Sequence, residues 1–243
     1  MDRGGGVPPG ALVRPVAVLG AVLLLSGSLL ALVSGLVGAR GAVGSALADL
    51  KGVLWANQEL NVWTWYSTLL LAGLAAAFAL TAVLRRRAGM PALDATVFAV
   101  VAAWLSADEA AALHERLGTV ARALGVRGTF EWVALGLPIA LIGAAALAVV
   151  ARRTDPSLRR GLALAAVLFL GGALVLEAGA GLLVETYGLS RAAPLFVLEV
   201  TLEEGLEAAG VLVALRAVLT GLRIAVGPDG LSAAVRTPTA AVR

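Results

Sequence analysis

The chain has 243 residues, of which 60% are hydrophobic and 14% are charged, and its formal net charge is +3. Ordinary soluble domains are about 45–50% apolar and about 25% charged, so this composition argues against a soluble enzyme and against a disordered chain. The chain has no cysteine and one histidine, which excludes disulfides, thiolate metal sites, iron–sulfur clusters and a bis-histidine haem. The excess of arginine does not indicate a nucleic-acid partner, because membrane proteins concentrate arginine in cytoplasmic loops.

Six segments of the chain are long and apolar enough to cross a bilayer, which takes a helix of about 20 residues. The first, second and fourth segments contain long runs without charge, whereas acidic residues interrupt the other three. This pattern predicts an all-α fold, an integral membrane bundle of six transmembrane helices. In chain order, the predicted spans are residues 15–38, 61–84, 92–117, 130–151, 161–185 and 192–219.

The first segment has to be distinguished from a cleaved signal peptide. Its charge-free run, Pro15–Ala39, is longer than the apolar region of about 7–15 residues that such a peptide contains. We therefore expect a retained helix. Residues 1–222 are predicted to form a single transmembrane domain, and residues 223–243 are predicted to form a disordered cytoplasmic tail.

Arginine residues indicate the orientation of the bundle, because they are enriched in cytoplasmic loops. They follow the second span as Arg85–Arg87, bracket the loop between the fourth and fifth spans, and follow the sixth span. Both termini are therefore predicted to be cytoplasmic (N-in/C-in). Most tryptophan and tyrosine residues lie near the opposite ends of the spans, as in an aromatic belt. We expect a multi-pass protein of the inner (cytoplasmic) membrane.

Acidic residues gather in the outer half of the predicted bundle, on the third, fifth and sixth spans. On the sixth span, Glu199, Glu203 and Glu207 recur at every fourth residue and share one face of a helix. A charged residue inside a membrane costs about 2.5–3.5 kcal/mol even on insertion scales and marks a functional site by default. The cluster comprises Asp108, Glu109, Glu115, Glu177, Glu203, Glu204 and Glu207. Three further acids at the ends of spans are interpreted as solvated interfacial residues: Glu59, Glu131 and Glu185.

This acidic cluster needs neutralisation. Two carboxylates about 6 Å apart repel by roughly 3 kcal/mol at an effective dielectric constant of about 20. Arg116 is the one basic residue of these segments on the outer side, so bound protons or cations must balance the charge. Carboxylates with one imidazole favour hard or borderline divalent metals, namely Mg, Mn, Ca, Fe or Zn. We expect one or two such ions, with Glu177 and Glu203 facing each other across the bundle.

Six residues are predicted to be metal ligands, and two carboxylates are assigned to catalysis. The ligands are Glu109, His114, Glu115, Glu177, Glu203 and Glu207, and the catalytic residues are Asp108 and Glu204. Carboxylates from separate helices are typical of di-iron and di-manganese bundles, which also use Glu-x-x-His pairs. Those pairs are missing here, since Ala112 lies three residues after Glu109 and no second histidine exists. The sequence is still compatible with a carboxylate-rich site that binds two metal ions.

Four sequence segments together resemble an uncharacterised family of bacterial, actinobacterial-type six-helix membrane proteins. They are Leu60–Ser67 at the start of a helix, Asp108-Glu109-x4-His114-Glu115, Leu176-Glu177 and Thr201-Leu202-Glu203-Glu204-x-x-Glu207-x-x-Gly210. The resemblance covers roughly residues 55–215. It implies that these acids and His114 belong to one recurring pattern, and it carries no activity that can be transferred to this chain.

Three functions are compatible with the pattern. The first is a metal-dependent membrane oxidoreductase acting on a lipid-soluble substrate such as a lipid or quinone. The second is a proton or divalent-cation transporter using the same acids, although the sequence shows no internal repeat and no pair of helices broken by Gly or Pro. The third is a non-catalytic subunit of a larger membrane complex. The expected partners are the lipid bilayer and a lipid-soluble small molecule, with a homo-oligomer or a complex as open alternatives.

Overall fold

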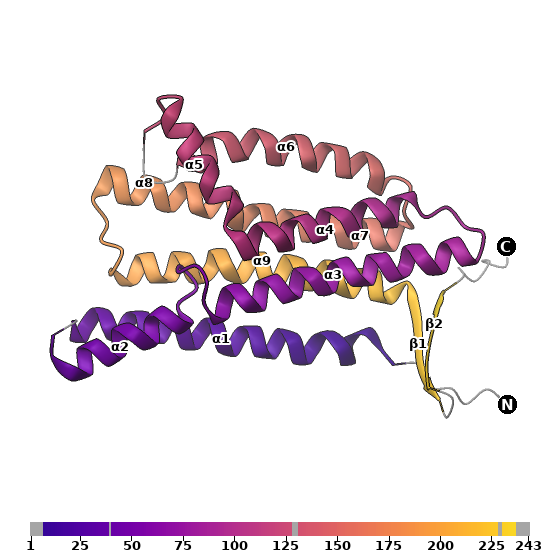
Figure 1. The fold of residues 1–243 in the computed structure, drawn as a ribbon, viewed down its shortest axis with the longest axis horizontal. Coiled ribbons are helices and arrows are strands. Elements are labelled where there is room, and N and C mark those ends of the chain that lie inside the picture. The colour runs from indigo at the N-terminus through magenta and orange to yellow at the C-terminus, as the bar shows by residue number, and fades with distance from the viewer. Residues whose placement is uncertain (1–6, 39, 128–130, 228–229, 237–243) are drawn as a thin grey trace.

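The computed structural model describes residues 7–38, 40–127, 131–227 and 230–236. In this part of the chain, long helices run side by side, and a β-hairpin lies at one end (Figure 1). The helical character predicted for the apolar segments is confirmed. The helices are α1 (Pro9–Val37), α2 (Gly41–Leu54), α3 (Val62–Arg87), α4 (Leu93–Ala111), α5 (Leu113–Ala123), α6 (Glu131–Ala151), α7 (Pro156–Leu170), the π-helix η1 (Gly171–Leu176), α8 (Glu177–Tyr187) and α9 (Pro194–Thr220).

Several of these helices are long and apolar enough to cross a membrane. Among the described residues there are four such segments, namely α1, α3, α6 and the continuous stretch Pro156–Tyr187. The bent pair of α4 and α5 adds a fifth if the two helices form one span. The sixth predicted span, 192–219, is a helix, but its four glutamates and one arginine keep α9 out of this group. Six spans with both termini inside therefore stay a prediction.

The acid-bearing helix α9 lies inside the bundle, where it packs against α1, α3 and α7 (Figure 1). Glycines allow the close approach on the α7 side. A Cβ atom added to Gly172 would lie 2.6 Å from the carbonyl oxygen of Glu203, and one added to Gly210 would lie 2.8 Å from that of Ala165. Small residues at helix contacts are the usual means by which membrane helices pack closely. The acids of α9 are thereby surrounded by neighbouring helices.

The helix α2 follows α1 and was not predicted from the sequence. It has 14 residues, which is too short to cross a bilayer, and it packs back against α1. Gly27 of α1 makes room for the end of α2, because a Cβ atom there would collide with the carbonyl oxygen of Leu54. α2 therefore leads the chain back along α1, so that α3 begins beside α1 and not at the tip of the bundle (Figure 1).

The third predicted span, 92–117, is a broken helix. Ala112 has left-handed backbone angles (φ 46°, ψ 48°), and α4 and α5 meet there at an angle of 73°. The physical reason is that the apolar sequence of α4 ends at this point, whereas α5 carries His114, Glu115 and Arg116 in its first turns. Because the break lies at an alanine, a search of the sequence for helices broken by Gly or Pro did not reveal it.

The fifth predicted span, 161–185, contains a second irregularity. Between α7 and α8 the chain forms the π-helix η1, which ends directly before Glu177. Gly171 and Gly172 begin this turn, and glycine lowers the cost of leaving regular helical geometry. Single π-helical turns inside α-helices are rare and occur frequently at functional sites.

The segment after α9 differs from the predicted disordered tail. Strand β1 (Leu222–Gly227) pairs antiparallel with β2 (Gly230–Val235). The sequence between them, with Gly227, Pro228, Asp229 and Gly230, contains the residue types that favour tight turns. The Val7 amide donates a hydrogen bond to the Ile224 carbonyl at 2.8 Å, which ties the start of α1 to this hairpin. Residues 237–243 of the predicted tail lie outside the described residues.

Candidate functional site

Three side chains meet where the loop before α3 approaches the first turn of α5. They are Glu59, His114 and Glu115, and one potential ligand atom of each lies within 4.8 Å of the other two. Glu59 lies in the loop before α3, whereas the other two lie in the first turn of α5. Glu59 and Glu115 are exposed and His114 is half-buried, so an ion could reach this group from solvent. We call these three residues the outer triad.

Local backbone geometry brings the outer triad together. The bend at Ala112 turns the first residues of α5 towards the start of α3. On the other side, Leu60 directly after Glu59 also has a positive φ of 59°. Asn61 fixes this loop, since its side chain accepts a hydrogen bond from the Thr64 amide at 3.0 Å and donates one to the Trp55 carbonyl at 2.6 Å. Non-glycine residues with positive φ cost about 1–3 kcal/mol each and cluster at functional sites.

The imidazole of His114 is held by two neighbours. Its Nδ1 atom lies 2.9 Å from Oδ2 of Asp108. Its ring makes an edge contact with Trp132, with 5.1 Å between ring centroids and 63° between planes. With Asp108 ionised, Nδ1–H donates to the carboxylate and Nε2 remains as the acceptor for a cation. A carboxylate bonded to one ring nitrogen is the usual support for a metal-binding histidine.

The electrostatics of the outer triad centre on Glu59, which lies outside the apolar spans. Partial burial is the largest cause that raises the pKa of Glu59 from 4.5 to about 7, and the carboxylates of Glu109, Glu115 and Asp108 act in the same direction. His114 lowers the pKa in part. A cation at the outer triad would therefore compete with a proton on Glu59 near neutral pH.

Behind the outer triad, three carboxylates from two helices surround a small cavity of about 20 Å³. Glu109 of α4 accepts a hydrogen bond from the Ser67 hydroxyl at 2.8 Å, and Glu204 of α9 accepts one from the Trp63 indole at 2.7 Å. Glu207 lines the same cavity. Most of the other lining residues are apolar, and the cavity is large enough for one water molecule.

A second acidic group lies between α8 and α9. Glu177 accepts a hydrogen bond from the Trp132 indole at 2.6 Å, which connects it to the support of His114. Glu203 interacts electrostatically with both Glu177 and Glu199. Glu199 is 8% exposed. The predicted direct approach of Glu177 to Glu203 stays a prediction, while their electrostatic proximity supports it.

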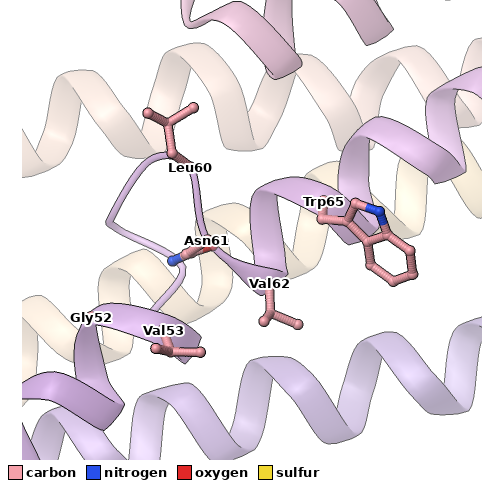
Figure 2. A pocket seen from close by; sticks show the side chains of 6 residues that line it. All are labelled: Gly52, Val53, Leu60, Asn61, Val62 and Trp65. Carbon is pink, nitrogen blue, oxygen red and sulfur yellow. The ribbon is translucent and has the colours of Figure 1, made fainter.

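A shallow apolar groove of about 300 Å³ adjoins the loop that carries Glu59. Its lining residues come from the end of α2, the connecting loop and the start of α3, as Figure 2 shows. They are Gly52, Val53, Leu60, Asn61, Val62 and Trp65. Because Leu60 is 83% exposed and Trp65 is 60% exposed, this groove presents large apolar surfaces next to the outer triad.

The comparisons place the chain in a family without an assigned activity. Residues 16–222 match a family model whose description is "Domain of unknown function (DUF8692)". The chain belongs to the DUF8692 family. Comparison with curated proteins and with solved structures finds no match. The matched residues of the DUF8692 chain include the outer triad and all the acids described above, so its function has to be inferred from these residues.

The predicted site residues of the DUF8692 chain separate into neighbouring groups. Among the predicted ligands, His114 and Glu115 lie in the outer triad, where the predicted catalytic Asp108 orients His114. The other predicted residues lie behind the outer triad: Glu109, Glu177, Glu203, Glu204 and Glu207. None of these contacts tests the metal-binding and catalytic roles that the sequence predicted for these residues.

Sequence reasoning missed Glu59, which was interpreted as a solvated interfacial residue. Its position directly before the second predicted span, on the same side as the other acids, was an available signal. The sequence did not reveal the bend at Ala112, which brings His114 and Glu115 close to the loop that carries Glu59. Glu131, which was also interpreted as solvated, has a side chain that is 14% exposed and accepts a hydrogen bond from the Arg122 guanidinium at 3.0 Å.

Proposed function

We propose that this DUF8692 protein is an integral membrane metal-binding protein and that the outer triad holds a divalent cation. The observation that carries the proposal is the geometry of His114. Oδ2 of Asp108 lies 2.9 Å from Nδ1 of His114. The potential ligand atoms of Glu59, His114 and Glu115 lie within 4.8 Å of one another. Two carboxylates and one imidazole favour a hard or borderline metal such as Mn²⁺, Fe²⁺ or Zn²⁺.

In this proposal the remaining acids support the metal instead of joining one compact site. Asp108 keeps His114 in the tautomer that leaves Nε2 free for the ion. Glu109, Glu204 and Glu207 surround the water-sized cavity directly behind the triad. Carboxylates bridged by water can pass protons, so this group would carry protons to and from the metal.

A redox reaction on a lipid-soluble substrate is the use of the metal that we propose first. The observation that favours it is the apolar groove of about 300 Å³ beside Glu59. An apolar tail would lie against Val53, Val62 and Trp65, which line the groove in Figure 2. Its polar end would face the outer triad, because Glu59 directly precedes Leu60 of the groove. The metal would supply the electron transfer and the acids the protons.

A cation or proton transporter is the second candidate, and the broken helices favour it. Transporters build their ion sites from discontinuous membrane helices. Here the 73° bend at Ala112 lies next to the outer triad, and η1 ends directly before Glu177. The acids then mark a route from the outer triad into the bundle.

Elemental analysis of protein purified without chelator tests the metal site. We expect about one equivalent of divalent metal at the outer triad, because deprotonated ligands in a folded site retain their ion. His114→Ala and Glu115→Gln should lose this metal. Asp108→Asn should weaken its binding about 10–100-fold, because Asp108 supports a ligand without being one.

The matched control is Asp49→Asn, which removes an exposed carboxylate from α2 outside the outer triad. It should keep the wild-type metal content. Retention of metal in His114→Ala, or loss of it in Asp49→Asn, would contradict the assignment. Turnover of a quinone without ion flux in proteoliposomes would favour the enzyme, and flux without turnover would favour the transporter. Metal-free protein that co-purifies with other chains in fixed ratio would instead indicate a structural subunit.

A further inference from the structure

The indole of Trp132, the second residue of α6, contacts side chains of two other helices. Its ring makes the edge contact with His114 of α5, at 5.1 Å between ring centroids. Its Nε1–H donates the hydrogen bond to Glu177 of α8, at 2.6 Å. Tryptophan can make both contacts at once, because it combines a large apolar ring with one polar donor. This side chain therefore connects a proposed metal ligand with an acid on a different helix.

A glycine on α6 makes room for this indole. Gly136 lies one turn after Trp132 and is buried, and a Cβ atom added to it would collide with the six-membered ring of the indole. The start of α6 also lies against α5, since a Cβ atom added to Gly118 would be 3.6 Å from the Trp132 amide nitrogen. The absence of a side chain at position 136 thus lets the indole lie where it reaches both His114 and Glu177.

Both partners of Trp132 follow an irregular point of the backbone. His114 comes two residues after the left-handed Ala112, at the bend between α4 and α5, and Glu177 comes directly after the π-helix η1. Because neither residue continues a long regular helix, the position of each side chain relative to the other depends on contacts between helices. Trp132 supplies such a contact to both.

We propose that Trp132 is a positioning residue of the outer triad, which holds the imidazole of His114 in place and couples it to Glu177. The proposal rests on the proposed function, because it takes His114 as a metal ligand. It deepens that function by assigning a regulation to the site, in which a change at Glu177 alters the outer triad through the indole. Asp108 selects the tautomer of His114 by its contact with Nδ1, whereas Trp132 restricts the tilt of the ring.

A direct electrostatic effect is the alternative route between the two residues. Glu177 and His114 lie within electrostatic range of each other, so the charge of Glu177 could act on the imidazole without the indole. The two routes differ in their dependence on Trp132. A direct effect persists when the indole N–H is removed, whereas the proposed coupling disappears.

Nuclear magnetic resonance of full-length, metal-free protein in detergent, with isotope-labelled histidine, tests the position of His114. The chain has one histidine, so its ring signals are unambiguous. Gly136→Ala should shift or broaden these signals, because the added methyl group displaces the indole without changing any residue of the site. The matched control is Gly143→Ala on the same helix, where no atom lies within 4 Å of the added Cβ. It should give the wild-type spectrum.

A double-mutant cycle tests the coupling to Glu177. Trp132→Phe keeps an aromatic ring beside His114 and removes the donor to Glu177, and Glu177→Leu removes the acceptor. Glu177→Leu should shift the His114 signals in wild type and leave them unchanged in the Trp132→Phe background. An equal shift in both backgrounds would overturn the coupling, since the effect of Glu177 would then bypass the indole N–H. This cycle also covers the case in which Gly136→Ala fails to fold.

Mn²⁺ titration followed by electron paramagnetic resonance extends the test to the metal site. Gly136→Ala should bind Mn²⁺ about tenfold more weakly than wild type, because loss of a group that supports a ligand costs about 10–100-fold, and Gly143→Ala should bind it as wild type does. Wild type that binds no Mn²⁺ would contradict the proposed function, and the metal-free spectra would still decide the role of Trp132. Unchanged His114 signals in a folded but less stable Gly136→Ala would overturn the positioning role, because packing of α6 alone affects stability and not the imidazole.

Discussion

At the scale of single residues, His114 and Glu59 show how a few contacts decide the chemistry of the bundle. Asp108 and Trp132 fix the imidazole of His114, and the loop held by Asn61 presents Glu59 to it. Partial burial, helped by the neighbouring carboxylates, raises the pKa of Glu59 to about 7, so this side chain is partly protonated near neutral pH. The outer triad is therefore sensitive to pH in the range in which cells operate.

The pKa of Glu59 predicts how metal-free protein responds to pH. Because the folded state raises this pKa from 4.5 to about 7, it binds the proton more tightly than the unfolded chain does. The contribution of Glu59 to the free energy of unfolding is therefore largest below about pH 4.5 and decreases as the pH rises through about 7. With chelator present, Glu59→Gln should raise the melting temperature at about pH 8 and leave it nearly unchanged at about pH 4.

Cation binding should show the opposite dependence on pH, because the ion displaces the proton from Glu59. Mn²⁺ affinity at the outer triad should rise between about pH 6 and pH 8. The groups that face Glu59 and contribute to this response are Glu109, Glu115, Asp108 and His114. Thermal unfolding with and without Mn²⁺ measures both effects. A Glu59→Gln melting curve that shifts equally at both pH values would contradict the prediction.

Most of the titratable residues of the site could be identified from the sequence, but which of them lie close together could not. Intramembrane acids are costly wherever they occur, so the cluster from Asp108 to Glu207 stands out from an apolar background. Glu59 does not stand out, because a carboxylate at the end of an apolar segment is ordinarily solvated. Its neighbours are decided by the left-handed residues Leu60 and Ala112, and neither leucine nor alanine signals such a conformation.

At the scale of elements, the contact between η1 and α9 positions the acids of both. Gly172 lies against the backbone of Glu203 and the side chain of Glu207. The irregular π-helical turn directly before Glu177 shifts the register of α8 relative to α7. Hydrophobicity predicted the extent of this apolar segment, but it contains no information on a π-helical turn. For the same reason the bend between α4 and α5 was not predicted.

Gly172→Ala should destabilise the protein by about 1–3 kcal/mol, because the added Cβ meets backbone that cannot move independently. That Cβ would lie 2.6 Å from the carbonyl oxygen of Glu203. The neighbouring Gly171→Ala is the matched control, since no atom lies within 4 Å of its added Cβ. Thermal unfolding in detergent should separate the two variants. Equal stability of both would show that this helix contact does not hold η1 against α9.

At the scale of the whole molecule, the polar features divide between the two ends of the bundle. α2 and α5 lie towards one end, and the β-hairpin lies with the start of α1 at the other (Figure 1). The outer triad belongs to the first of these two groups, since its residues come from the loop after α2 and from the first turn of α5. Arg85 and Arg86, at the end of α3, bond to Asp94 and Thr96 of α4. Composition and hydropathy predicted the helices, because segments long and apolar enough to cross a membrane carry a strong pattern. The hairpin was missed, because its short strands carry no comparable signal.

The division of charge predicts which end faces the cytoplasm. Arginine-rich loops favour the cytoplasmic side, so the end with the hairpin should lie inside and the outer triad outside. Ser157 lies at the start of the continuous apolar stretch Pro156–Tyr187, and Ser190 lies just beyond its end. Since the natural chain has no cysteine, a single cysteine at either position gives an unambiguous labelling signal. In intact cells, Ser190→Cys should react with a membrane-impermeant maleimide, and Ser157→Cys should react after lysis alone. The reverse pattern would place the outer triad at the cytoplasmic surface, where it would bind ions from inside the cell.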